Sequence, residues 1–244
     1  MADDTGKDRA HWTKAANEWI AWAGKPGHDA FWAYKDHLIN YIGEGCGQAL
    51  EVGCGEGRVS RVLKHCGYEV TATDPVAELV KAAQNSDSAH HYAVCAADAL
   101  PFPSLSFDLV VAYNVLMDIE SMPAALTEMR RVMRPKGLLM ISIVHPLADA
   151  ARFTDGGPEA PFVITEPYFG RKQFEGTEVR DGLRMSFFGW SDSLQGYADA
   201  LENAGLAIVS LKEPMPDTHF GADQMKRWTR MPLFLWLKAR SLAP

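Results

Sequence analysis

The sequence has few cysteines, and they show no metal-binding spacing. Four cysteines are present, at positions 46, 54, 66 and 95, without a C-x-x-C pair. Together with the eight histidines they give no zinc pattern. We therefore expect reduced thiols, as in a cytoplasmic protein, and no metal site.

Long apolar runs are also missing. The longest, near residues 109–117 and 138–144, are too short to span a membrane. Residues 1–4, Met-Ala-Asp-Asp, lack the basic and apolar regions of a signal peptide. Both features favour a cytoplasmic protein with no membrane partner.

The sequence also lacks an excess of basic residues. The 24 Lys and Arg residues are outnumbered by 31 Asp and Glu, which gives a net charge of −7 with no basic stripe. We therefore expect no nucleic-acid partner. Hydrophobic residues make up 47% of the 244 residues, enough for one large domain or one domain with an insertion.

A glycine-rich stretch at residues 48–57 is the feature that organises the chain. A short apolar run ends at Glu51 and leads into three glycines at alternate positions, and a helical apolar pattern follows over 58–66. The glycines are Gly53, Gly55 and Gly57. Glycine permits a close backbone approach or a positive φ angle. The order predicts a strand, a tight turn and a helix, as at the start of a βαβ nucleotide-binding unit.

Details of this loop indicate what it binds. A dinucleotide site needs a third glycine at position 58, which is Arg58, and no phosphate-binding P-loop motif is present. The carboxylate of Glu51 would repel a pyrophosphate but suits a ligand that carries an ammonium. The E-x-G-x-G-x-G pattern resembles the first motif of class I S-adenosylmethionine (SAM) methyltransferases. The resemblance implies that the loop holds the methionine part of SAM; a glycine-rich turn without a ligand is the alternative.

A second acid ends the next predicted strand. Residues 68–75 are rich in β-forming residues and contain Asp74, 21 residues after Gly53. Such an acid is placed to accept hydrogen bonds from ribose hydroxyls, and the resemblance implies the SAM ribose, with Pro75 beside it. Asp74 could instead, or in addition, cap the helix predicted over 76–84.

Further candidate cofactor residues follow from the same resemblance. Residues 97–102 are similar to the D-A-x-x-L-P-F stretch of family members, which implies that Asp98 accepts from the adenine amino group. The backbone of Ala99 would contact the ring edge. Asn114, after the fourth strand, and Trp19, in the N-terminal helix, complete the predicted cofactor site.

Strand and helix patterns alternate from residue 48 to residue 144, which indicates a doubly wound α/β sheet. The R-V-M-R-P-K-G stretch at 131–137 precedes the fifth strand, and we expect a turn at 134–137. The order of motifs resembles the small-molecule, type 11 group of class I methyltransferases. That resemblance implies a Rossmann-like sheet of seven strands with the last strand antiparallel, the final strands falling at 206–212 and 231–239.

Three regions are expected. Residues 1–45 form an N-terminal helical cap, residues 46–145 and 191–244 form the SAM-binding domain, and residues 146–190 form an aromatic-rich lid or substrate insertion. The helix at 8–23 carries three tryptophans, which either cover the site or pack on the domain. The 146–190 segment is expected to be irregular and functional; a small β-subdomain without substrate contact is the alternative.

Catalytic candidates lie at the carboxyl ends of the strands, where ligands bind in such sheets. They are Tyr113, Asn114 and Asp118 after the fourth strand and His145 after the fifth. Methyl transfer from a sulfonium requires alignment and exclusion of water more than a fixed catalytic motif. His145 could act as a base or orient the acceptor, and a structural role is equally compatible with its position.

We therefore expect a methyltransferase that uses SAM, releases S-adenosylhomocysteine and acts on an oxygen or nitrogen of a small aromatic or hydrophobic acceptor, as in secondary metabolism. A monomer or a homodimer is expected. One alternative is a SAM-binding sensor or scaffold without turnover. Another is an NAD-dependent oxidoreductase, which Arg58 and Glu51 disfavour. Residues 188–191 depart from the type 11 pattern, so the acceptor's identity does not follow from it.

Overall fold

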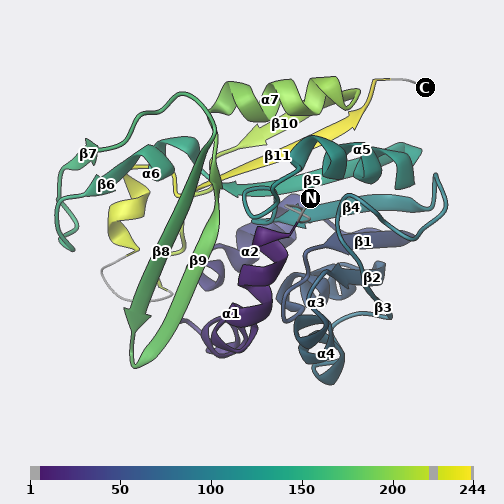
Figure 1. Cartoon of the computed structure of the whole chain (residues 1–244), viewed down its shortest axis with the longest axis horizontal. Helices are drawn as coiled ribbons and strands as arrows, with labels where there is room; N and C mark the ends of the chain where they lie inside the picture. The colour runs from purple at the N-terminus through teal and green to yellow at the C-terminus, as the bar shows by residue number, and fades with distance from the viewer. Residues whose placement is uncertain (1–5, 220–224, 243–244) are drawn as a thin grey trace, which may run out of the picture.

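The computed structural model describes residues 6–219 and 225–242, so the expected ranges 1–45 and 191–244 each include residues outside this description. Its centre is a seven-stranded sheet with the strand order β10-β11-β5-β4-β1-β2-β3 (Figure 1). The strands are β1 (Gln48–Val52), β2 (Glu69–Asp74), β3 (His91–Val94), β4 (Phe107–Tyr113), β5 (Met133–Val144), β10 (Leu206–Lys212) and β11 (Phe234–Ser241). β1 to β5 run parallel, and β11 is antiparallel to both neighbours, which confirms the expected fold.

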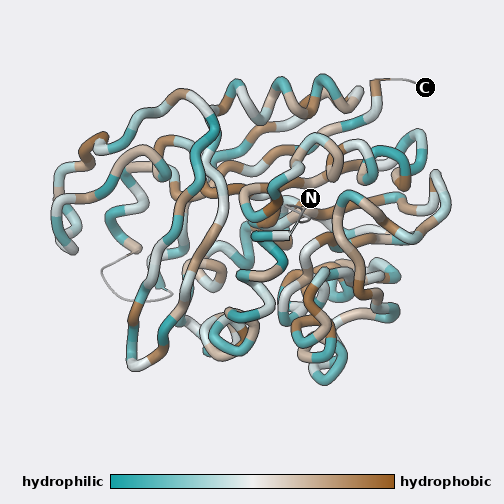
Figure 2. The backbone as a smooth tube through the Cα atoms, in the orientation of Figure 1, coloured by the Kyte–Doolittle hydropathy of each residue, from teal (hydrophilic) through white to brown (hydrophobic). Residues whose placement is uncertain are grey.

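Helices cover both faces of the sheet, because successive strand residues point to opposite faces. On one face, residues such as Leu50 and Val110 pack against α5 and α7. On the other, residues such as Ala49 and Val111 pack against α2, α3 and α4. The helices are α1 (Lys7–Gly24), α2 (Phe31–Ile42), α3 (Arg58–His65), α4 (Ala77–Asn85), α5 (Met122–Val132) and α7 (Leu194–Asn203). Figure 2 shows hydrophobic residues concentrated along the central strands between these layers.

The predicted turn at residues 134–137 does not precede the fifth strand, because β5 already begins at Met133. The pairing of β5 with β4 shifts from Phe107 opposite Met133 to Leu109 opposite Leu138. Residues 134–137 therefore form a bulge within β5. They do not form a turn between α5 and β5. Arg134 is anchored there by an ion pair with Asp108.

Residues 146–190 are not irregular, contrary to expectation. They form α6 (Pro146–Ala150), the paired strands β6 (Ala151–Phe153) and β7 (Phe162–Ile164), and most of a long hairpin. The hairpin consists of β8 (Lys172–Arg180) and β9 (Leu183–Ser191), paired along their whole length. Alternation of aromatic and polar residues, as in Phe174 and Phe188, fits this two-stranded ribbon better than a loop.

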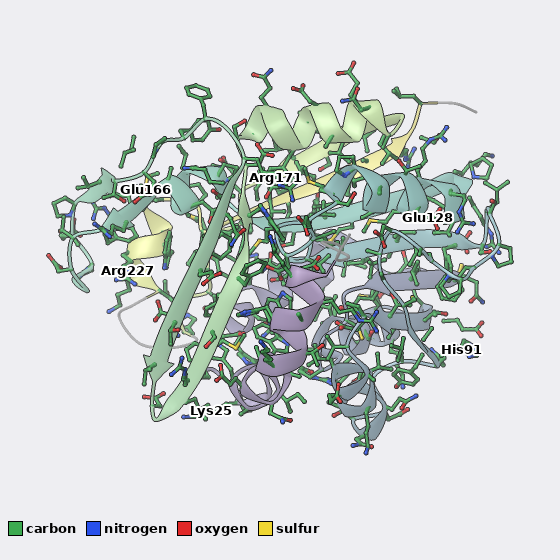
Figure 3. All side chains as sticks on the ribbon, in the orientation of Figure 1. Lys25, His91, Glu128, Glu166, Arg171 and Arg227 are labelled. Carbon is green, nitrogen blue, oxygen red and sulfur yellow. The ribbon has the colours of Figure 1, made fainter. Side chains whose placement is uncertain are left out.

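The hairpin lies along α1 (Figure 1). Ala15 and Trp22 of α1 form an apolar cluster with Met185 of β9. Glu18 accepts a hydrogen bond from the Ser186 backbone N–H at 3.0 Å. The base of the hairpin is tied to the segment after β4, because Arg171, which Figure 3 labels, donates to the Ile119 carbonyl at 2.7 Å. α1 and the hairpin thus form one layer beside the carboxyl ends of the strands.

The remaining described helix is the short 3-10 helix η1 (Lys226–Thr229). Across residues 6–219 and 225–242, no helix combines the length and the apolar character needed to cross a bilayer. All four cysteines are free thiols.

Candidate functional site

The glycine loop between β1 and α3 requires its glycines for geometric reasons. Gly53 and Gly55 have φ angles of 71° and 54°, in the region that side chains disfavour. A Cβ at Gly53 would lie 2.1 Å from the Val115 side chain, and one at Gly55 would lie 2.7 Å from the Trp19 indole nitrogen. The loop therefore packs closely against α1 and the segment after β4.

Glu51 is the penultimate residue of β1 and is only 2% exposed. Its carboxylate accepts a hydrogen bond from the Ser60 hydroxyl. Burial raises the pKa of Glu51 to about 8, although the Ser60 hydroxyl opposes the shift. A ligand ammonium placed here would restore the charged form, so the site fits the amino group expected of the ligand.

Asp74 ends β2, and its carboxylate accepts two backbone hydrogen bonds. One carboxylate oxygen accepts from the Gly55 backbone N–H at 3.0 Å, which holds the glycine loop. The other accepts from the Val76 backbone N–H at 2.9 Å, which forms the turn into α4, although Val76 itself is the cap residue. Burial raises the pKa of Asp74 to about 6, against these two bonds. The remaining lone pairs are available to hydroxyl donors.

These groups meet at a cavity of about 700 Å³, in the size range of cofactor sites. The predicted residues that line it are Trp19, Glu51, Gly53, Gly55, Asp74, Pro75, Asp98, Tyr113, Asn114 and Asp118. Gly57 and Ala99 do not line it. Gly57 instead faces Ser88 and Ala83, and the Ala99 N–H donates to the Ala96 carbonyl at 3.2 Å in a turn.

Two predicted residues at the end of β4 enter this cavity. The Tyr113 hydroxyl is buried near Ser142 but makes no hydrogen bond of ordinary geometry within the described residues. Burial raises its pKa well above the usual range. Asn114 adopts a φ angle of 53°, and its side-chain oxygen accepts from the Ser142 hydroxyl at 2.6 Å. Tyr113 is therefore a buried donor that a ligand could satisfy.

The structure does not bring His145 to the cavity. Its Nδ1 accepts from the Leu147 backbone N–H at 3.1 Å at the start of α6, so its Nε2 carries the proton and donates to Glu213 at 3.0 Å. Burial lowers its pKa, although Glu213 opposes the shift. Both ring nitrogens are engaged, and the residue lines neither this cavity nor the one beside it. This geometry favours the structural role over the expected base.

A second cavity, of about 840 Å³, adjoins the first. Its walls come from α1, α2, η1 and the β8–β9 hairpin, and include the aromatic residues Trp22, Trp32, Phe174, Phe187 and Trp228. Residues of the hairpin therefore line a cavity, and the segment is a β structure, as the alternative of a small β-subdomain expected. Five residues line both cavities: Trp12, Trp19, Arg58, Asn114 and Asp118.

Arg58 is the functional candidate that the sequence pattern did not identify. It replaces the third glycine of a dinucleotide motif, and its guanidinium lies 4.9 Å from the Trp19 ring centroid and 4.6 Å from that of Phe31. Asp29 pairs with it in an ion pair that is about nine-tenths buried. The three tryptophans of α1 indicated an aromatic surface near the site. Residue spacing alone could not show that Arg58 lies over the Trp19 ring.

Comparisons with known proteins agree with this geometry. Residues 50–141 match the family Methyltransf_11, described as a methyltransferase domain. The chain is 36% identical over 170 residues to the malonyl-[acyl-carrier protein] O-methyltransferase of Enterobacter lignolyticus, covering 68% of this chain and 63% of that protein. The chain thus spans less than two thirds of the length of the curated relatives it matches.

Solved structures show the same fold. A SAM-dependent methyltransferase from Mesorhizobium loti matches with a TM-score of 0.65 at 21% identity, over 87% of this chain and 98% of that one. The [4+2]-cyclase SpnF matches with a TM-score of 0.63 at 17% identity, over 96% of each chain. Fold, loop and family match agree that residues 50–141 form a methyltransferase domain and that the chain has the fold of SAM-dependent methyltransferases.

Proposed function

We propose that this protein transfers a methyl group from SAM to an oxygen or nitrogen atom of a small acceptor with an apolar or aromatic skeleton. The observation that carries the proposal is the pair of adjoining cavities. One is lined by the glycine loop, Glu51 and Asp74, the other by aromatic side chains, and five residues belong to both.

The cofactor would be held by residues of the first cavity. Glu51 suits its ammonium, and Asp74 suits its ribose hydroxyls. Arg58, which also lines this cavity, is already paired with Asp29, so its cation would meet the cofactor carboxylate only through its remaining N–H groups. When bound, SAM supplies a methyl group already activated on a sulfonium, so the protein mainly aligns the reactants and excludes water.

The acceptor would occupy the second cavity. Its aromatic walls suit a flat or apolar skeleton, and the five shared residues mark where the two ligands meet. Closure of α1 against the hairpin keeps bulk water from this meeting point. No covalent intermediate is required of the protein's own residues.

A carboxylate acceptor on a carrier protein is the second candidate, because the curated relatives are named as malonyl-[acyl-carrier protein] O-methyltransferases. The chain spans only part of those proteins, and the aromatic cavity is large enough for several kinds of acceptor. The two candidates differ in the charge of the accepting group, which an assay can separate.

Formation of S-adenosylhomocysteine from SAM, measured against a panel of amines, alcohols and carboxylates, tests the proposal. We expect product formation that depends on the acceptor. Tight SAM binding without turnover on any acceptor would instead indicate a sensor or scaffold. Because a [4+2]-cyclase has the same fold, the fold alone does not decide between these outcomes.

A further inference from the structure

Asp118 occupies the junction of the two cavities. It follows β4 in a short turn, in which its backbone N–H donates to the Val115 carbonyl at 2.9 Å. Its side chain lines both cavities. Within the described residues its carboxylate makes no hydrogen bond and no ion pair. An unpaired carboxylate between a cofactor cavity and an acceptor cavity faces the place where the reacting groups meet.

The other polar groups of the shared wall are not partners for Asp118. Arg58, the cation of this wall, is engaged by Asp29. Asn114 accepts from Ser142. Trp12 retains a buried indole N–H without a hydrogen bond in the described part of the chain. Among the side chains of this wall, Asp118 contributes the carboxylate, and it has no hydrogen-bond or ion-pair partner within residues 6–219 and 225–242.

The charges that act on Asp118 from the surrounding elements are mainly acidic. They come from Asp8 of α1, Asp74 at the end of β2 and Asp149 of α6, and the last also lines the acceptor cavity. Burial and these three acids raise the pKa of Asp118 well above its usual range. A carboxylate acceptor would place one more negative charge among these acids. An acceptor that carries a proton would add no negative charge and could give that proton to Asp118.

We propose that Asp118 is a catalytic residue that accepts the proton of the methyl acceptor, and that the acceptor group is therefore an amine or a hydroxyl rather than a carboxylate. The inference rests on the proposed function and narrows its substrate class. The acceptor's lone pair forms the new bond to the methyl carbon. The carbon–sulfur bond breaks with its electron pair left on sulfur, and the acceptor's proton passes to Asp118.

The test compares acceptors that differ in one group. The probes are 2-phenylethylamine, 2-phenylethanol and 3-phenylpropanoate, together with the same three groups on an indole skeleton. Binding is measured by calorimetry on the full chain saturated with S-adenosylhomocysteine, and methylation is measured with SAM. We expect the amine or alcohol probes to bind at least about tenfold more tightly than the carboxylates, and to be methylated.

Asp118→Asn keeps the shape of the side chain and removes its capacity to accept a proton. We expect it to reduce the preference for amine or alcohol by about tenfold or more and to lower turnover by about 10²-fold, with S-adenosylhomocysteine binding unchanged. Asp36→Asn, the same change at an exposed position of α2 outside both cavities, should alter none of these quantities.

Three results would overturn the inference: equal or tighter binding of the carboxylate probes, a preference that survives in Asp118→Asn, or no binding of any amine or alcohol probe. Since the wild-type comparison needs no variant, a folding defect in Asp118→Asn would not obscure the answer. Failure of S-adenosylhomocysteine itself to bind would count against the proposed function instead, so the two failures are distinguishable.

Discussion

Glu51 is a carboxyl group buried in the sheet without an ion-pair partner among the described residues. Its pKa of about 8 in the folded protein lies above its ordinary value of 4.5. Between these values the folded protein retains a proton that the unfolded chain releases. The unfolded chain is therefore favoured increasingly as the pH rises through this range.

We expect Glu51→Gln to remove this dependence. Relative to the variant, the wild type should lose stability between pH 4.5 and pH 8, by on the order of a few kcal/mol in total. Urea unfolding of both proteins at several pH values measures the difference. A constant difference across the range would show that Glu51 is ionised in the folded protein. Asp74 is present in both proteins, so its own titration largely cancels.

Asp74 is expected to hold the cofactor ribose. Removal of its carboxylate leaves ligand hydroxyls and the Gly55 N–H without a partner, so Asp74→Ala should weaken SAM binding by about 1–3 kcal/mol. Calorimetric titration measures the effect. Asp199→Ala, at an exposed position of α7, is the matched control. Unchanged affinity in Asp74→Ala would remove this residue from the ribose site.

His145 is expected to contribute to stability more than to turnover. Its ring caps α6 through Leu147 and contacts Glu213, so His145→Ala should destabilise the fold by about 1–2 kcal/mol. Turnover should fall less than about tenfold, because the ring faces neither cavity. Thermal unfolding and steady-state kinetics separate the two effects. If His145→Ala lost turnover by about 10²-fold or more at normal stability, His145 would have to act as a base after all.

At the scale of elements, α1 and the β8–β9 hairpin form a cover joined by one apolar cluster, two hydrogen bonds and a largely exposed ion pair. Their shared cluster is small, and the hairpin pairs only with itself over most of its length. A two-stranded ribbon is marginally stable alone, so its order depends on α1 and on what fills the cavity beneath.

We therefore expect amide hydrogen exchange in residues 8–23 and 172–191 to slow when S-adenosylhomocysteine and an acceptor bind. Residues 206–212, in β10 at the far edge of the sheet, serve as the internal reference. Protection that is equal in all three segments would indicate general stabilisation, and no change in the first two would argue against a mobile cover.

The elements that the sequence predicted well are those with a strong period. The strand, loop and helix around Glu51 and the acid after β2 follow from apolar runs and glycine spacing. The β8–β9 hairpin was not predicted as such, because residues 146–190 break the alternation of strand and helix patterns; a small β-subdomain was only the alternative. The hairpin is ordered by the pairing of β8 with β9. The sequence pattern of either strand alone does not reveal that pairing.

At the scale of the whole molecule, the site depends on contacts between distant segments. The sequence predicted Glu51, Asp74 and Tyr113 because they fall at carboxyl ends of strands, which parallel topology brings to one edge. It did not predict that Arg58 lies between rings of α1 and α2, or that Asp118 is unpaired. The position of Arg58 arises only when the fold places Trp19 and Phe31 around the loop.

Calorimetric titration of the wild-type chain with SAM, S-adenosylhomocysteine and NAD is the most direct test of the central claim. The two cavities, Glu51 and Asp74 predict binding of SAM and S-adenosylhomocysteine at one site, with affinity in the micromolar range, and none of NAD. Binding of NAD with no binding of either sulfur ligand would contradict the account.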